Sequence, residues 1–81
     1  MKKWVLIIIH DRAIDLFKSF DTFEEAQEEM ENDFLSCIDP EEFRKACDKN
    51  GGSYSEDWAL EERCAWISGR DNIDWFIEAV A

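Results

Sequence analysis

The sequence has few of the residues from which catalytic and metal centres are built. One histidine and scattered cysteines provide no zinc-ligand spacing. The histidine is not close in sequence to any cysteine, so a catalytic histidine–cysteine pair would require that the fold bring the two together. His10 lies at an expected turn, where we expect it to be solvated or to have a capping role. We expect each cysteine to be a small hydrophobic residue of the core. We therefore expect a protein that is not an enzyme, with no catalytic residue, metal site or cofactor; the residues concerned are His10, Cys37, Cys47 and Cys64.

Long hydrophobic runs and phosphate-binding glycine loops are also missing. The apolar run Trp4–Ile9 has six residues, whereas a bilayer span needs roughly 18 to 20. Lys2 and Lys3 precede it as in a signal peptide, but no small-residue cleavage site follows, so we interpret the run as a strand. Gly51–Gly52 is interpreted as the end of a helix. The odd number of cysteines argues against a disulfide framework and favours the reducing cytoplasm.

Basic residues are outnumbered by acidic residues, nine to twenty, and the net charge is -11. Such a chain should be repelled by nucleic acid and by anionic membrane surfaces, and no basic stripe is visible. The imbalance is greatest between Lys18 and Arg44, where there are ten acids and no base. We therefore expect a basic protein surface as the partner, with no direct nucleic-acid binding and no membrane binding.

The start of the chain predicts a β-hairpin within a single domain, residues 1–81. Trp4–Ile9 is apolar at every position and rich in β-branched residues, which is typical of a strand inside a sheet that is covered on both faces. A turn follows. Ile14, Leu16 and Phe20 then share one parity, which predicts a half-buried second strand with these three residues on one face.

Two helices are expected in the middle of the chain. Thr22 and Glu25 match a capping box that starts the first helix. Asp39 as N-cap and Pro40 at the first helical position start the second helix, and Gly51 follows its end. Apolar residues of the first helix recur at spacings of three and four, which predicts one stripe facing the core: Phe23, Ala26, Met30, Phe34, Cys37 and Ile38.

The segment Trp58–Ile67 gives conflicting signals. Its large apolar residues alternate, which favours a strand, whereas residues 59–63 are good helix formers. We predict a strand, because "SGRDN" after it is typical of a hairpin loop and Asn72–Val80 can be its partner. The predicted fold class is α+β: a single ββα(α)ββ domain with a four-stranded, antiparallel-rich sheet and a helix layer on one face.

This layout resembles a group of known sequences. It has an early hairpin, "FDTFEEA" at Phe20–Ala26 opening a helix, and a late hairpin with "AWI" at Ala65–Ile67 and "DWFI" at Asp74–Ile77. In these features the chain is similar to short uncharacterised ββαββ proteins of gut Firmicutes and their phages. The resemblance implies no particular activity or site residue, and it favours an accessory protein of a mobile element or phage.

The first expected helix carries a row of acids. Carboxylates four apart on a helix repel each other at a cost of about 0.2 to 0.5 kcal/mol per pair. One interpretation is a solvated face that serves solubility. The other is a binding face that imitates a phosphate backbone and occupies a basic surface of a nucleic-acid-handling protein, as a DNA mimic or anti-defence inhibitor would. The candidate partner-binding residues are Glu24, Glu25, Glu28, Glu29, Glu31 and Asp33.

The four tryptophans and the apolar first strand support an alternative function. Trp4–Ile9 supplies three apolar residues to each face of the sheet, whereas a helix layer covers only one face. We expect at least two tryptophans in the core, and an apolar patch on the second face that serves self-association or a partner. The alternative is therefore a small structural homo-oligomer, such as a homodimer, joined through this second face, with acids that serve only solubility.

Overall fold

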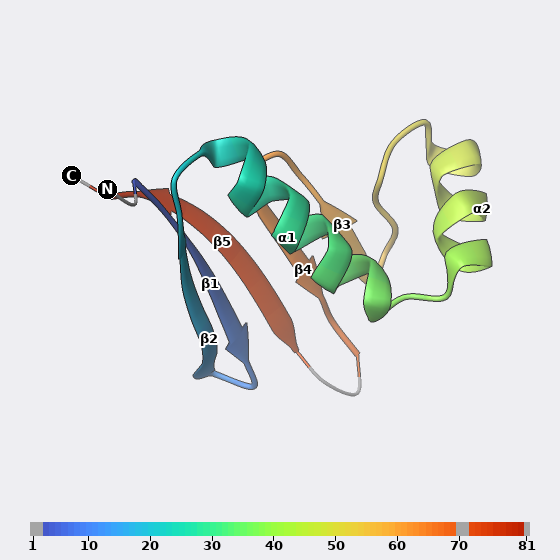
Figure 1. Cartoon of the computed structure of the whole chain (residues 1–81). Coiled ribbons are helices and arrows are strands. Elements are labelled where there is room, and N and C mark those ends of the chain that lie inside the picture. The colour runs from blue at the N-terminus through green and yellow to red at the C-terminus, as the bar shows by residue number, and fades with distance from the viewer. Residues whose placement is uncertain (1–2, 70–71, 81) are drawn as a thin grey trace.

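The computed structural model describes residues 3–69 and 72–80, which form one sheet and two helices (Figure 1). Within these residues the sheet has five strands in the order β2-β1-β5-β4-β3, and every neighbouring pair is antiparallel. The predicted α+β class is confirmed, as are the first hairpin and the position of β1 inside the sheet. Along the chain the elements are β1 (Trp4–His10), β2 (Ala13–Phe20), α1 (Phe23–Ser36), α2 (Pro40–Asn50), β3 (Trp58–Leu60), β4 (Cys64–Ile67) and β5 (Ile73–Ala79).

The predicted number of four strands is wrong, because the segment Trp58–Ile67 contains two strands. β3 and β4 pair with each other, and Glu61 N donates to Cys64 O at 2.8 Å where the chain turns between them. In the sequence, the alternation of large apolar residues keeps to even-numbered positions from Trp58 through Trp66. This alternation therefore could not reveal that the chain reverses direction between the two strands. Beyond β3, an isolated bridge between Tyr54 and Ala59 adds a sixth, one-residue strand at the edge. Residues 70–71 of the predicted loop that follows β4 lie outside the described residues.

The core lies between α1 and one face of the sheet. Figure 1 shows α1 crossing that face, with α2 beyond the end formed by β3. The ring of Phe34 meets the ring of Trp75 edge-on, with 5.4 Å between their centroids. Helix α2 has no buried residue and reaches the core through Phe43, whose ring stacks on Trp58. The fully buried residues of the core are Leu6, Ala26, Met30, Phe34, Trp75 and Ile77, each at most 1% exposed.

The helix ends are formed by the predicted capping residues. Thr22 Oγ1 accepts a hydrogen bond from Glu25 N at 3.2 Å, and the Asp39 carboxylate accepts one from the first turn of α2 at 2.9 Å. Gly51 follows α2 with a φ of 71°, a left-handed conformation that glycine adopts without steric cost. The stripe prediction is wrong for Cys37, which is the exposed C-cap of α1, because the helix and its period end at the preceding residue.

A β-bulge in β2 separates residues that were predicted to share a face. Ile14 and Leu16 pair with the adjacent residues Ile9 and Ile8, so β2 contains one residue more than β1 between these pairs. The extra residue reverses the parity of the strand. Phe20 therefore packs against the core, whereas Ile14 lies on the opposite face and is 68% exposed. The prediction of one common face is wrong for these two residues; the side chain of Leu16 lies outside what the structure describes.

Candidate functional site

The acidic face of α1, defined as Glu24 with the other five predicted partner-binding residues, lies along one helix. The side of α1 that contains Ala26, Met30 and Phe34 is buried against the sheet. On the opposite side the first half of the acidic face is exposed to solvent, and the second half runs along the partly buried flanks of the helix. The exposed members are Glu24, Glu25 and Glu28, and the partly buried members are Glu29, Glu31 and Asp33.

Two of these carboxylates bond neighbouring side chains at the protein surface. Thr22 Oγ1 donates to Glu25 Oε1 at 3.1 Å, which makes Glu25 part of the helix cap. Lys18 Nζ lies 2.7 Å from Glu29 Oε1 in an ion pair between β2 and α1. Both side chains of this pair are more than a third exposed, so we expect it to contribute no more than about 1 kcal/mol. The acidic block contains no base in sequence, but the sheet brings Lys18 beside it.

Asp33 has a structural partner in the core. The indole Nε1–H of Trp75 donates to Asp33 Oδ2 at 2.7 Å, and Trp75 is 0% exposed. The carboxylate therefore satisfies the only polar group of a buried side chain. By contrast the carboxylates of Glu24, Glu28 and Glu31 form no hydrogen bond or ion pair with any other residue in the described ranges. These three carboxylates are the part of the acidic face that the fold itself does not use.

The turn between β3 and β4 adds to this surface an acid, Glu62, that the sequence analysis missed. The side-chain amide of Gln27 donates to the backbone oxygen of Glu62 at 3.1 Å, although the two residues are 35 positions apart. This contact holds the turn against the flank of α1, where Glu62 is exposed; the neighbouring Glu61 is also exposed, but its carboxylate bonds Cys64. The segment was predicted as the middle of one strand, so no local pattern could have placed Glu62 beside the helix.

His10 and each of the three cysteines contact different residues. His10 ends β1, and its Nε2 lies 3.5 Å from the Asp11 carboxylate. Cys64 Sγ donates to Glu61 Oε2 at 2.9 Å; this hydrogen bond and partial burial raise the pKa of the thiol from 9.0 to about 11. A thiol with such a pKa is a poor nucleophile at neutral pH. Over residues 3–69 and 72–80, no group of three or more histidine, cysteine or acidic side chains is placed to hold a metal ion.

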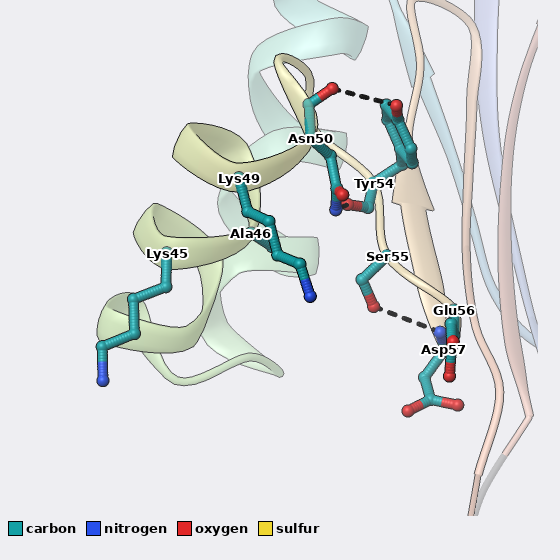
Figure 2. Close-up of a pocket in the computed structure, with 8 residues that line it drawn as sticks. All are labelled: Lys45, Ala46, Lys49, Asn50, Tyr54, Ser55, Glu56 and Asp57. Carbon is teal, nitrogen blue, oxygen red and sulfur yellow. Dashed lines mark hydrogen bonds between the residues drawn. The ribbon is translucent and has the colours of Figure 1, made fainter.

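A shallow cleft of about 560 Å³ separates the end of α2 from the chain that leads to β3 (Figure 2). Tyr54 closes one end, where its hydroxyl donates to Asn50 O and Asn50 Nδ2 donates to Tyr54 O, both at 2.9 Å. Figure 2 shows Lys49 directed into the cleft and Lys45 directed away from it, with Asp57 on the opposite wall. The lining mixes both signs of charge, so the cleft does not continue the acidic face.

The sheet face opposite α1 is an apolar surface that the helices leave open. Successive residues of a strand point to opposite faces of the sheet, so the odd-numbered residues of β1 lie on this face, opposite the face that contains Leu6. Each of two such residues has cross-strand neighbours on the same face, and together they form two rows. Three apolar residues of these rows are exposed: Ile14 is 68% exposed, Phe17 62% and Phe76 37%. We call this surface the open sheet face; its rows are Phe17–Ile7–Phe76–Cys64 and Ile14–Ile9–Asp74–Trp66.

The tryptophans divide between the core and the open sheet face. Trp58 and Trp75 are buried, at 7% and 0% exposure, which confirms that at least two of the four are core residues. Trp4 packs edge-on against Phe23 at 5.2 Å between ring centroids. Trp66 lies on the open sheet face opposite Asp74 and is partly exposed. Most of the exposed apolar surface on that face thus comes from residues other than tryptophan.

Comparison of the chain with protein-family models, with curated proteins and with solved structures finds no match. The resemblance to short ββαββ proteins of Firmicutes and phages therefore stays a prediction. Neither helix in the described part of the chain is long and apolar enough to cross a membrane.

Proposed function

We propose that this protein is a non-enzymatic acidic binding module whose α1 face occupies a basic surface of a nucleic-acid-handling protein. The observation that carries the proposal is the set of three carboxylates, Glu24, Glu28 and Glu31, that bond no other described residue. Glu24 and Glu28 stand four apart and repel each other by about 0.2 to 0.5 kcal/mol. A row that lowers stability and has no role in the fold is explained if a partner uses it.

The geometry of α1 suits a positively charged partner. Side chains three and four apart on a helix have Cβ atoms about 5 to 6 Å apart, so these carboxylates form a line of closely spaced negative charges. Glu62 extends the same surface on the flank of the helix. A groove that binds a phosphate backbone presents lysines and arginines at short intervals, and a rigid acidic row can occupy them. The concrete form of this function is a DNA mimic or anti-defence inhibitor of a phage or mobile element.

The first test compares two triple variants with the same change in net charge. One replaces Glu24, Glu28 and Glu31 with glutamine. The control replaces three exposed acids away from α1 whose carboxylates likewise bond no other described side chain: Asp48→Asn, Glu56→Gln and Asp57→Asn. Both variants are used to capture partners from host lysate at two salt concentrations. We expect the α1 variant to lose the partner and the control to retain it, because only the α1 variant removes the proposed contacts.

A competition experiment then tests the mimicry itself. The captured protein should bind duplex DNA, and increasing DNA should displace it from the acidic module, with affinity that falls as salt rises. Equal capture of the partner by wild type and by the α1 variant would show that the acidic face is not a binding surface and serves only solubility. Equal loss in both triple variants would mean that net charge alone attracts the partner. A partner that binds DNA and the module simultaneously would exclude mimicry.

A further inference from the structure

The open sheet face combines exposed apolar residues with charges of both signs. Phe17 and Phe76 flank Ile7 across three neighbouring strands, and together they form an uninterrupted apolar row. Monomeric proteins seldom leave a contiguous apolar patch of this kind on a sheet without a function for it. It lies on the side of the sheet away from α1, so the acidic face and the open sheet face are separate surfaces.

The charges around this patch are of both signs, although the whole chain has a net charge of -11. By strand alternation Lys3 lies on the open sheet face together with Val5. Arg12 borders a hollow of about 380 Å³ whose lining includes residues of the face such as Asp74. These two bases offset Asp74 and Glu78, the two acids that β5 contributes to the face; Glu61 is a third acid there, because its carboxylate accepts a hydrogen bond from Cys64 of the same face. The strong negative field of the protein therefore originates mainly from other surfaces.

We infer that the open sheet face packs against the same face of a second copy of the chain. In such a dimer the two sheets form the centre and the two α1 helices lie on the outside. Packed sheets are about 10 Å apart, and a helix layer lies at a similar distance, so the two acidic faces are roughly 30 Å apart. This is several times the Debye length of about 8 Å at physiological salt, and their repulsion is screened. A second copy can therefore bind here despite its charge.

The area of the face meets the requirement for a stable dimer. Three long strands of about 23 Å and two short strands, spaced about 4.8 Å apart, give a face of roughly 450 Å² in projection. Protruding side chains such as Phe17 and Ile14 increase the accessible area, so two copies bury about 1,000 Å², the lower limit for a specific interface. The alternative of pairing along the edge strand β2 is opposed by its bulge, which interrupts the ladder that a partner strand would extend.

The experiment measures the mass of the protein by sedimentation velocity from micromolar to millimolar concentration at physiological salt. The wild-type chain is expected to form a dimer. Phe17→Glu places a charge in the apolar row of the interface on both copies, and we expect it to weaken association at least tenfold. Leu35→Glu is the matched control: Leu35 is an exposed apolar residue on α1, at 39% exposure, and its replacement should leave the dimer intact. Circular dichroism verifies that both variants fold.

Three results would overturn the inference. The first is a wild-type chain that stays monomeric at millimolar concentration. The second is association that Phe17→Glu leaves unchanged, which would place the contact at the β2 edge or elsewhere. The third is equal weakening by Phe17→Glu and Leu35→Glu, which would assign the effect to added charge rather than to the face. Protection of Trp66 from a soluble quencher on dimerisation gives an independent measure of the same contact, since Trp66 lies on this face.

Discussion

Replacement of Asp33 by alanine is expected to destabilise the fold, although the sequence places this residue in an acidic, partner-binding row. Its carboxylate accepts the indole hydrogen of Trp75 at 2.7 Å, and Trp75 is 0% exposed. Without the carboxylate, the indole N–H would remain in the core without an acceptor. Glu31 lies two positions earlier on the same helix; its carboxylate bonds no other described residue, so it provides the comparison.

The expected loss follows from the environment of this hydrogen bond. A hydrogen bond to a charged group contributes about 1.5 to 3 kcal/mol, and leaving a buried donor without a partner costs about 1 to 3 kcal/mol. A hollow of about 300 Å³ adjoins Asp33, and water entering it can replace part of the lost bond. Alanine also favours the helix by up to about 0.7 kcal/mol. We therefore expect Asp33→Ala to lower the free energy of unfolding by about 1 to 2 kcal/mol, or Tm by roughly 4 to 16 °C.

Urea denaturation followed by far-ultraviolet circular dichroism measures this loss without relying on tryptophan fluorescence. Asp33→Asn keeps an oxygen acceptor and has a helix propensity close to that of aspartate, so it should lose less than Asp33→Ala. Glu31→Ala should remain within about 0.5 kcal/mol of wild type. If Asp33→Ala were as stable as Glu31→Ala, the hydrogen bond to Trp75 would make no contribution to stability. Asp33 would then again be a candidate partner-binding residue.

Two further predictions concern single positions. Gly51→Ala should destabilise by about 1 kcal/mol in urea denaturation, because nothing lies within 4 Å of an added Cβ and only the left-handed φ of 71° is unfavourable; Gly51→Asn should lose less, and equal losses would contradict this reasoning. Because the pKa of Cys64 is raised from 9.0 to about 11, its alkylation at pH 8, followed by mass spectrometry of each cysteine, should be about 100-fold slower in the folded than in the unfolded chain, and Glu61→Gln should accelerate it. The raised pKa stabilises the fold below pH 9.0, and this contribution should disappear as pH rises from 9.0 to about 11; equal alkylation rates in both states would show that the Glu61 contact is absent in solution.

The sequence by itself determined the features whose interacting atoms are a few residues apart. Thr22 and Asp39 cap their helices as predicted, because each side chain bonds a backbone N–H two or three positions ahead. Gly51 ends α2 for a similar reason, since its own φ decides the conformation. The apolar period of α1 correctly identified Ala26 and Phe34 as buried, because one stripe of a helix must face the core.

Only the tertiary structure decided features that depend on the pairing of distant segments. The reversal between β3 and β4 and the bulge in β2 are properties of strand register, and a period of two in the sequence does not encode them. The roles of the acidic residues on α1 also differ from the prediction because distant segments pair with them. Lys18 reaches Glu29 from β2, and Trp75 reaches Asp33 across 42 positions of the chain. These contacts form only when α1 docks on the sheet, so docking decides which carboxylates the fold uses and which it leaves exposed to solvent.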